Sequence, residues 1–189
     1  TMTYGTGSAA TAAVGTYTGT ATPSAATGGT FTAANYTITY VAGNIIVSKA
    51  TLTITASNVT KNYGTAITGK TGSTAFTSSG LKNGQTIGSV TIAYGTGATA
   101  TSKAGSYSGS VTPSAATGGT FIAADYTVSY VTGSITVSKV PLTITANNDT
   151  KVQGNANPTL TVSYSGFVNG ETNSALTTQP TITTTATTR

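Results

Sequence analysis

The sequence predicts an all-β protein made of tandem repeat domains of about 90 residues, each a β-sandwich or a β-grasp-like sheet, arranged as a rod. Three observations lead to this prediction. The same ten letters, TPSAATGGTF, occur at Thr22–Phe31 and again at Thr112–Phe121. Apolar and polar residues alternate with the period of a strand. The composition combines ten Tyr and four Phe with many Val, Ile and Thr, which favour strands.

The internal repeat extends well beyond that decapeptide. At the same offset of 90 positions, LTITASNVTKNYGT (Leu52–Thr65) aligns with LTITANNDTKVQGN (Leu142–Asn155). GLKNGQT (Gly80–Thr86) aligns with GFVNGET (Gly166–Thr172) at an offset of 86. Such extended self-similarity marks a tandem repeat, and the later copy lacks four residues in one loop.

The repeat boundaries follow from Pro141, which stands at the junction SKVPLTITA. Proline lacks a backbone N–H and therefore suits the first residue of a strand. We expect the C-terminal part of a first repeat in residues 1–49, a complete repeat in residues 50–139, and the N-terminal part of a third repeat in residues 140–189. No Gly/Ser tract separates neighbouring repeats, which predicts a semi-rigid connection.

The strands near the end of each repeat follow from local alternation. Tyr36, Ile38 and Tyr40 alternate with Thr, the pattern of a half-buried strand. The segment Ala42–Asn44 then supplies the Gly and Asn of a tight turn, and the chain returns through Ile45–Val47. We therefore expect a hairpin at this point in each repeat.

Comparison of the copies predicts which face of the returning strand is buried. Ile45 and Val47 recur as Ile135 and Val137, whereas Ile46 is replaced by Thr136. Alternate residues lie on opposite faces of a strand, so we expect the Ile45 and Val47 face to be the core. A helix is expected only as a single turn within residues 80–89.

The charge pattern argues against a nucleic-acid partner. The net charge of +5 comes from eight Lys and Arg against three acids, and the cations stand singly along the chain. A nucleic-acid-binding protein concentrates its cations to neutralise several phosphates together. The chain has no Cys, so neither disulfides nor Cys metal sites are available to it.

No stretch of the sequence predicts membrane insertion. An α-helix that crosses a bilayer needs ~20 predominantly apolar residues, and no apolar run approaches that length. The segment begins with Thr rather than with a signal peptide. We therefore expect any export signal or anchor to have been removed or to lie outside this segment.

No residue pattern predicts catalysis. General acid–base chemistry needs His or paired carboxylates, and the chain has no His and no neighbouring pair among Asp125, Asp149 and Glu171. Calcium needs several clustered oxygen ligands, and no GK[ST] of a phosphate-binding loop follows the Gly-rich segments ATGGTF and TGSTAFTSSG. We therefore expect no enzyme, no catalytic, cofactor-binding or metal-ligating residue, and no cofactor.

Two sets of side chains admit a binding role beside a structural one. Evenly spaced Thr occur at Thr51, Thr53 and Thr55 and again in Thr181–Thr188. Such rows could bind ice or glycans or carry O-linked sugars, although Thr is also an ordinary residue of an uncharged sheet face. Tyrosines could stack on sugars or pack across strands. They recur as Tyr4, Tyr17, Tyr36 and Tyr40 and as Tyr94, Tyr107, Tyr126 and Tyr130.

The junction lysines raise a third alternative. Lys49 and Lys139 recur at the end of the repeat, where a Lys buried beside an acid could condense with Asn or Asp into an isopeptide crosslink. No carboxylate accompanies either lysine in the sequence. A solvated Lys with its stem on the surface is the simpler explanation.

The ordered motifs resemble a known repeat family. LTITA, KNYGT, GLKNGQT, AGSYSG and ADYTVSYVTGSITVSK occur in that order and resemble the mostly-beta, glycine-rich (MBG, or YDG-type) repeats of large secreted bacterial adhesins and surface fibres. The third copy departs from the pattern at Gln153, which stands where Tyr63 stands in the second. The resemblance implies a secreted or cell-surface location and a stalk or adhesive role.

The two partial repeats together predict a head-to-tail arrangement. Thr1 aligns with Thr91 and Arg189 aligns with Thr99, so the two parts more than cover one domain. Each part exposes strand edges that another part could complete. We expect a structural stalk or fibre whose partner is an identical chain or a continuation of the same repeat array. The alternative function is a glycan- or ice-binding adhesive module, with a glycan as partner.

Overall fold

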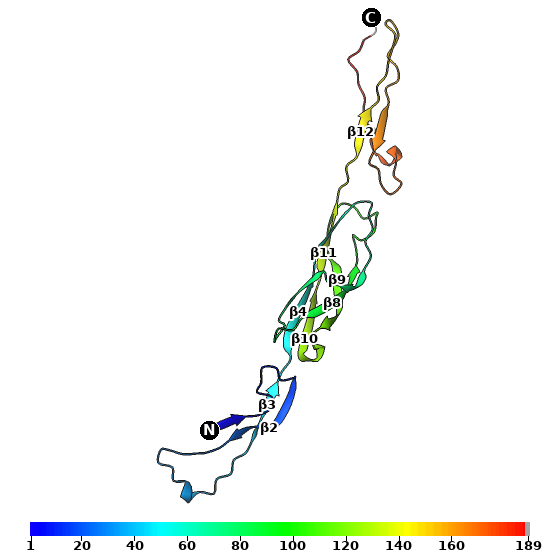
Figure 1. The fold of residues 1–189 in the computed structure, drawn as a ribbon. Helices are drawn as coiled ribbons and strands as arrows, with labels where there is room; N and C mark the ends of the chain where they lie inside the picture. The colour runs from blue at the N-terminus through cyan, green and yellow to red at the C-terminus, as the bar shows by residue number, and fades with distance from the viewer. Residues whose placement is uncertain (188–189) are drawn as a thin grey trace. The chain divides into compact units, whose positions relative to one another are not determined.

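The computed structural model describes residues 1–187, and its elements are strands apart from three short 3-10 turns (Figure 1). This all-β fold is the class that the sequence predicts. The strands are β1 (Met2–Tyr4), β2 (Gly15–Pro23), β3 (Gly43–Val47), β4 (Ala50–Ala56), β5 (Val59–Asn62), β6 (Lys70–Ser73), β7 (Phe76–Ser79), β8 (Ile87–Tyr94), β9 (Gly105–Gly119), β10 (Tyr126–Val131), β11 (Gly133–Ser138), β12 (Thr143–Ala146) and β13 (Val162–Ser165). The turns are η1 (Ala33–Asn35), η2 (Ala123–Asp125) and η3 (Asn173–Ala175).

Packing divides the chain into two compact units, each assembled from segments that are distant in sequence. The first unit comprises Thr1–Ser57, Lys70–Ala93 and Thr112–Thr132; the second comprises Asn58–Gly69, Tyr94–Val111 and the chain from Gly133 onward. Strand β9 belongs to both units. It is the middle strand of a sheet with the order β5-β11-β9-β8-β6.

In the first unit, β4 is the central strand of the sheet β10-β4-β7. Strand β10 runs parallel to it, with Tyr126 opposite Ala50, and β7 runs antiparallel. Leu52 and Ile54 of β4 are completely buried, whereas the alternating Thr51 is exposed and Thr53 and Thr55 are half-buried. The alternation of LTITA therefore places its apolar residues on one face, because successive side chains point to opposite faces of a strand.

Further core residues of the first unit come from β8. This strand lies between β6 and the C-terminal part of β9, and it contributes the buried Val90 and Ile92. The core of this unit thus combines side chains from two different sheets, as in other packed β-domains. The same unit contains the antiparallel sheet β1-β2-β3.

In the second unit, β11 lies between β5, which runs parallel to it, and the N-terminal part of β9, which runs antiparallel. Ile135 and Val137 of β11 and Val111 of β9 are buried. Thr136 between them is exposed, so the predicted core face of this strand is confirmed. The second unit also contains the antiparallel pair β12-β13.

The strand registers repeat with the sequence. Thr53 lies opposite Ser79 in the complete repeat, and Thr143 lies opposite Ser165 in the third segment. Strands β2 and β3 likewise reproduce the register of β9 and β11. The first segment therefore keeps the strand pairs equivalent to β8-β9 and β9-β11, and the third segment keeps the pair equivalent to β4-β7.

Burial differs sharply between equivalent residues. Ile54 is 0% exposed, whereas Ile144 at the equivalent position is 42% exposed. Tyr126 is 4% exposed, whereas its equivalent Tyr36 is 65% exposed. The reason is that β4 and β10 pair with each other in the complete repeat, while their equivalents occur in different segments of the chain. The local sequence suffices to form the strand pairs but not to cover the core face.

The predicted hairpin around Ala42–Asn44 is wrong. In the complete repeat β10 pairs with β4, and β11 pairs with β5 and β9, so the two consecutive strands belong to different sheets. In the first segment Tyr36–Val41 forms no strand, and only β3 follows it. Alternation of apolar and polar residues predicts that a segment is a strand, but it does not predict the strand with which that segment pairs. Here the partner of β10 is β4, the first strand of the repeat.

The single helical turn expected within residues 80–89 is a tight turn instead. Asn83 and Gly84 both have positive φ angles, 54° and 67°, and the Gln85 N–H donates to the Lys82 carbonyl over 2.9 Å. The 3-10 turns η1 and η2 lie elsewhere, directly before Tyr36 and Tyr126. No pattern that we considered in the sequence predicts them.

Candidate functional site: paired end strands and repeat junctions

The strands at the two ends of the complete repeat pair in parallel. Six residue pairs join β10 to β4, from Tyr126 opposite Ala50 to Val131 opposite Thr55. Four further pairs join β11 to β5, from Ile135 opposite Val59 to Ser138 opposite Asn62. The hydrogen bonds of parallel pairs are evenly spaced along the strands. The first two strands of the repeat are thus hydrogen-bonded, side by side, to its last two strands.

Tyr126 joins β10 to the loop that follows β7. Its hydroxyl accepts a hydrogen bond from the Lys82 N–H over 2.9 Å and donates to Gln85 Oε1 over 2.6 Å. The ring lies 5.6 Å from that of Phe121 between centroids. The ring of this buried Tyr therefore packs against an aromatic neighbour, and its hydroxyl both accepts and donates a hydrogen bond.

One hydrogen bond recurs where one repeat follows another. In the first unit the Asn83 side-chain amide donates to the Ala10 carbonyl over 3.1 Å, and in the second unit Asn169 donates to Ala100 over the same distance. Both asparagines have positive φ angles, 54° and 56°, a conformation that Asn tolerates better than most residues. The equivalence of all four residues makes this contact a property of the repeat rather than of one junction.

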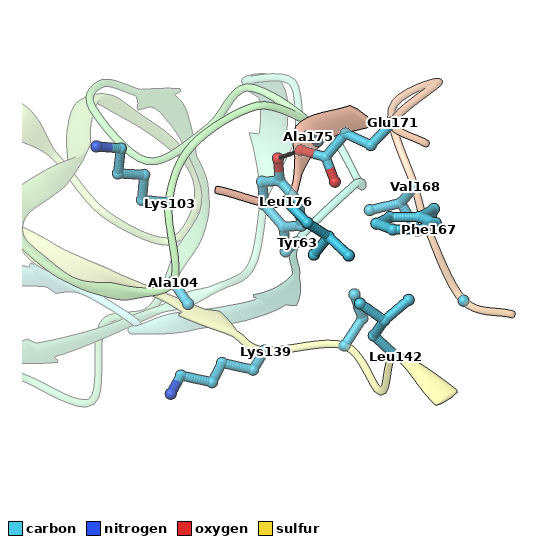
Figure 2. A pocket seen from close by; sticks show the side chains of 12 residues that line it. Tyr63, Lys103, Ala104, Lys139, Leu142, Phe167, Val168, Glu171, Ala175 and Leu176 are labelled. Carbon is cyan, nitrogen blue, oxygen red and sulfur yellow. Dashed lines mark hydrogen bonds between the residues drawn. The ribbon is translucent and has the colours of Figure 1, made fainter. Parts of the chain in front are cut away.

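A shallow cavity of about 430 Å³ lies beside the junction residues of the second unit (Figure 2). Apolar side chains form most of its lining, including Leu142, Phe167 and Leu176. The Tyr63 hydroxyl donates to Glu171 Oε1 over 2.5 Å, and the amino groups of Lys103 and Lys139 point away from that carboxylate. Glu171 is the one acid among the lining residues, and Tyr63 binds its carboxylate. Since both lysines point away, the lining residues include no acid and base placed together for proton transfer.

The buried lysine of the second unit is Lys61, which sequence reasoning missed. Its side chain is 6% exposed, and its Nζ donates to the carbonyls of Thr65 and Thr99 over 2.7 and 2.6 Å. The junction residues Lys49 and Lys139 are exposed. The feature of the sequence that could have indicated a role for Lys61 is its recurrence as Lys151. Both acceptors of Lys61 are backbone carbonyls, so its hydrogen-bond partners include neither the Asn or Asp side chain nor the acid that an isopeptide bond requires.

The three acids occupy separate places. Asp125 Oδ1 accepts a hydrogen bond from the Val14 N–H over 3.3 Å, and Asp149 Oδ1 accepts one from the Thr150 N–H over 2.8 Å. Glu171 is the acceptor for Tyr63. Within residues 1–187 no group of three or more His, Cys, Asp and Glu side chains lies close enough to hold a metal ion. In the same part of the chain, no helix has the length and apolar character that a membrane crossing requires.

Side chains with hydroxyl groups form most of the outward face of the sheet β10-β4-β7, on which Val131 lies opposite Thr55. Thr53 lies between Ser129 of β10 and Ser79 of β7, and Thr55 lies opposite Thr77. The predicted row of Thr on β4 is therefore one row of a wider array. The second Thr stretch differs, because residues 181–187 form no strand and Thr188 lies outside the described residues.

The tyrosines divide between packing and exposure. Tyr17 lies opposite Ile45 and Tyr107 opposite Ile135, and each hydroxyl donates to a carbonyl four residues earlier over 2.8 Å. These two tyrosines pack across strands, as the structural interpretation expects. Tyr4, at 62% exposure, does not.

A family model described as the MBG domain (YGX type) matches residues 52–136 and, a second time, residues 142–189. No curated protein and no solved structure matches the chain. The two matched ranges cover more than half of the chain and contain the motifs LTITA and KNYGT or their equivalents. The chain therefore belongs to the MBG domain family, as a β-rich repeat module.

Proposed function

We propose that this chain is a structural segment of an extracellular stalk or fibre, belonging to a bacterial surface adhesin or filament, and that it performs no catalysis. Its repeats continue head to tail and act as spacers that transmit force. The location and the adhesin context rest on the family, whose repeats occur in secreted bacterial surface proteins. The mechanical role rests on the strand topology.

The parallel pairing of the end strands is the observation that carries this proposal. Tension along the chain enters the complete repeat at β4 and leaves it through β10 and β11. Since β10 runs parallel to β4 and β11 runs parallel to β5, this tension slides each pair of strands lengthwise. All hydrogen bonds of a pair then bear the load together, whereas a hairpin pulled open at its ends loses them one at a time.

The junctions support the head-to-tail part of the proposal. The Asn83 contact with Ala10 and the Asn169 contact with Ala100 join the loop after β7, and the equivalent loop after β13, to the preceding repeat. Only Ser48 and Lys49 separate β3 from β4. A connection this short, with a side-chain contact across it, favours a fixed spacing between successive repeats over a flexible linker.

Single-molecule stretching of the 189-residue chain tests the proposal. The complete repeat should unfold in one event that lengthens the chain by roughly 300 Å, since ~90 residues extend by about 3.4 Å each. The Tyr126→Phe chain, which loses the bonds between β10 and the loop after β7, should unfold at lower force. Gradual lengthening without a discrete event would contradict a force-bearing role.

The hydroxyl array on β10-β4-β7 favours a second function, a glycan- or ice-binding adhesive module. Rows of Thr and Ser on three neighbouring strands offer evenly spaced donors, acceptors and methyl groups, with neighbouring strands ~4.8 Å apart. Glycan arrays and ice-recrystallisation assays on the full chain test it. Binding that is lost on Thr53→Glu but kept on Thr136→Glu would favour the module; no binding in either assay would favour the spacer alone.

A further inference from the structure

The segment Lys61–Thr65, whose sequence is KNYGT, belongs to the complete repeat and contacts the third segment of the chain. The residues that it meets there form the turn Val168–Glu171, in which the Glu171 N–H donates to the Val168 carbonyl over 3.0 Å. A backbone carbonyl, a glycine and a tyrosine hydroxyl of the complete repeat each contact a different residue of this turn. Both partners lie within the second unit.

We propose that Lys61–Thr65 is a docking segment through which one repeat holds the turn Val168–Glu171 of the repeat that follows, and that Lys61 is its positioning residue. This inference rests on the proposed head-to-tail function and identifies the side chains that fix the spacing between repeats. The stability of a tandem array depends on each repeat and on the interfaces between neighbours. The docking segment makes the complete repeat stabilise the turn that follows it.

The docking segment is held within the complete repeat. The Tyr63 N–H continues the pairing of β5 with β11 by donating to the Ser138 carbonyl over 2.9 Å. Lys61, which is buried, donates from Nζ to the carbonyls of Thr65 and Thr99. One ammonium group therefore joins the end of the docking segment to the loop after β8.

A carbonyl of that loop accepts from both repeats. The Gly64 N–H donates to the Ala100 carbonyl over 3.0 Å, and the Asn169 side-chain amide donates to the same carbonyl over 3.1 Å. A carbonyl oxygen has two lone pairs, so one serves the complete repeat and the other serves the third segment. The second of these bonds recurs between Asn83 and Ala10 in the first unit. The shared carbonyl thus links the docking segment to the following repeat.

Gly64 leaves room for the turn to approach. Its φ of 88° lies in the left-handed region, which glycine adopts without strain. A Cβ added at this position would lie 2.8 Å from the Cβ of Val168, which is closer than two such atoms approach each other. The missing side chain therefore serves both the local backbone conformation and the contact with the following repeat.

The Tyr63 side chain supplies the third contact. Its hydroxyl donates to Glu171 Oε1 over 2.5 Å, and Figure 2 shows the two side chains pointing toward each other. Hydrogen bonds to a carboxylate are charge-assisted and stronger than those between neutral groups. The third copy carries Gln153 at the position of Tyr63 and lacks the phenol on which this contact depends. Docking through this contact is therefore specific to a copy that carries Tyr.

Amide hydrogen exchange followed by NMR on the full chain tests the proposal. The readout is the Glu171 amide, which donates to the Val168 carbonyl within the third segment. Tyr63→Phe should accelerate exchange at this amide about tenfold, because the turn loses a charge-assisted bond and opens more readily. The matched control is Tyr130→Phe, which removes a hydroxyl that accepts from the Ala116 N–H within the complete repeat. The control should leave the Glu171 exchange rate within about twofold of its original value.

Two further substitutions test the positioning role and the reciprocity of the coupling. Lys61→Met should accelerate exchange at the Glu171 amide by a similar factor, although both acceptors of Lys61 belong to the complete repeat. Lys61→Arg, which keeps a cation at this position, should restore part of the protection. Glu171→Ala should accelerate exchange at the Gly64 amide, because coupling between two sites is reciprocal. Adding Tyr63→Phe to that chain should cause no further change at Gly64.

Unchanged exchange at the Glu171 amide in the Tyr63→Phe chain would overturn the proposal, as would equal acceleration by Tyr130→Phe. A Glu171 amide that exchanges as fast as a free peptide in the unsubstituted chain would also overturn it. Loss of protection at Gly64 but not at Glu171 in the Lys61→Met chain would refute the positioning role. If the complete repeat unfolds in one event under tension while Tyr63→Phe leaves exchange unchanged, the docking segment is refuted and the spacer function stands. Gradual lengthening together with accelerated exchange gives the opposite result.

Discussion

Truncating one isoleucine at two equivalent positions should have very different consequences for stability. Ile54→Ala removes three carbons from a completely buried site, and Ile144→Ala removes the same atoms from a site that is 42% exposed. Large-to-small substitutions in a closed core cost about 2–5 kcal/mol, because a cavity penalty adds to the lost transfer free energy. At ~0.8 kcal/mol per buried CH₂, and without an enclosed cavity, the second substitution should cost about 1 kcal/mol.

Urea unfolding followed by tyrosine fluorescence and circular dichroism measures the difference, since the chain has ten Tyr and no Trp. For a denaturant slope of about 2 kcal/mol/M, Ile54→Ala should lower the main unfolding midpoint by about 1–2.5 M. Ile144→Ala should shift that midpoint by less than about 0.5 M. Equal shifts, or a larger shift for Ile144→Ala, would refute the conclusion that only the complete repeat has a closed core.

Three further substitutions test individual contacts. Tyr126→Phe removes two hydrogen bonds of a buried hydroxyl and should cost about 1–3 kcal/mol in urea unfolding, while Tyr36→Phe should cost less than about 0.5 kcal/mol. Gly80→Ala should lower the melting temperature strongly, because Gly80 has a φ of 108° and a Cβ there would overlap a backbone carbonyl of β4; Gly84→Ala, in open space at a φ of 67°, should lower it less. Lys61→Met leaves two carbonyls without their ammonium donor and should cost about 1–3 kcal/mol in the same urea assay.

The faces of the strands could be predicted from the sequence, but their partners could not. Replacement of Ile46 by Thr136 correctly indicates the outward position, and Ile46 is 71% exposed. The hairpin around Ala42–Asn44 was wrong because Gly and Asn also serve where a chain passes from one sheet to another. The pairing of β10 with β4 joins residues 76 positions apart, and nothing in local alternation encodes so distant a partner.

The contacts at the candidate site were harder to predict than the fold. Asn83 and Asn169 recur in the sequence, yet recurrence alone does not distinguish a turn residue from one whose side chain reaches the preceding repeat. Lys61 lies on β5 among polar neighbours, and its burial depends on the carbonyls of Thr65 and Thr99, the second of which is distant in sequence. The row of Thr on β4 was predicted, but its extension by Ser129 and Ser79 required the strand order.

The direction of the applied force tests the central claim most directly, namely that parallel end strands let the repeat withstand tension. One chain is held through Cys introduced at Ala50 and Lys139, so that β4 and β10 slide lengthwise. A second is held through Cys at Thr55 and Thr77, directly opposed residues of β4 and β7, so that these strands are pulled apart sideways. We expect the first chain to unfold at clearly higher force than the second. Equal forces, or a lower force for the first chain, would contradict the account.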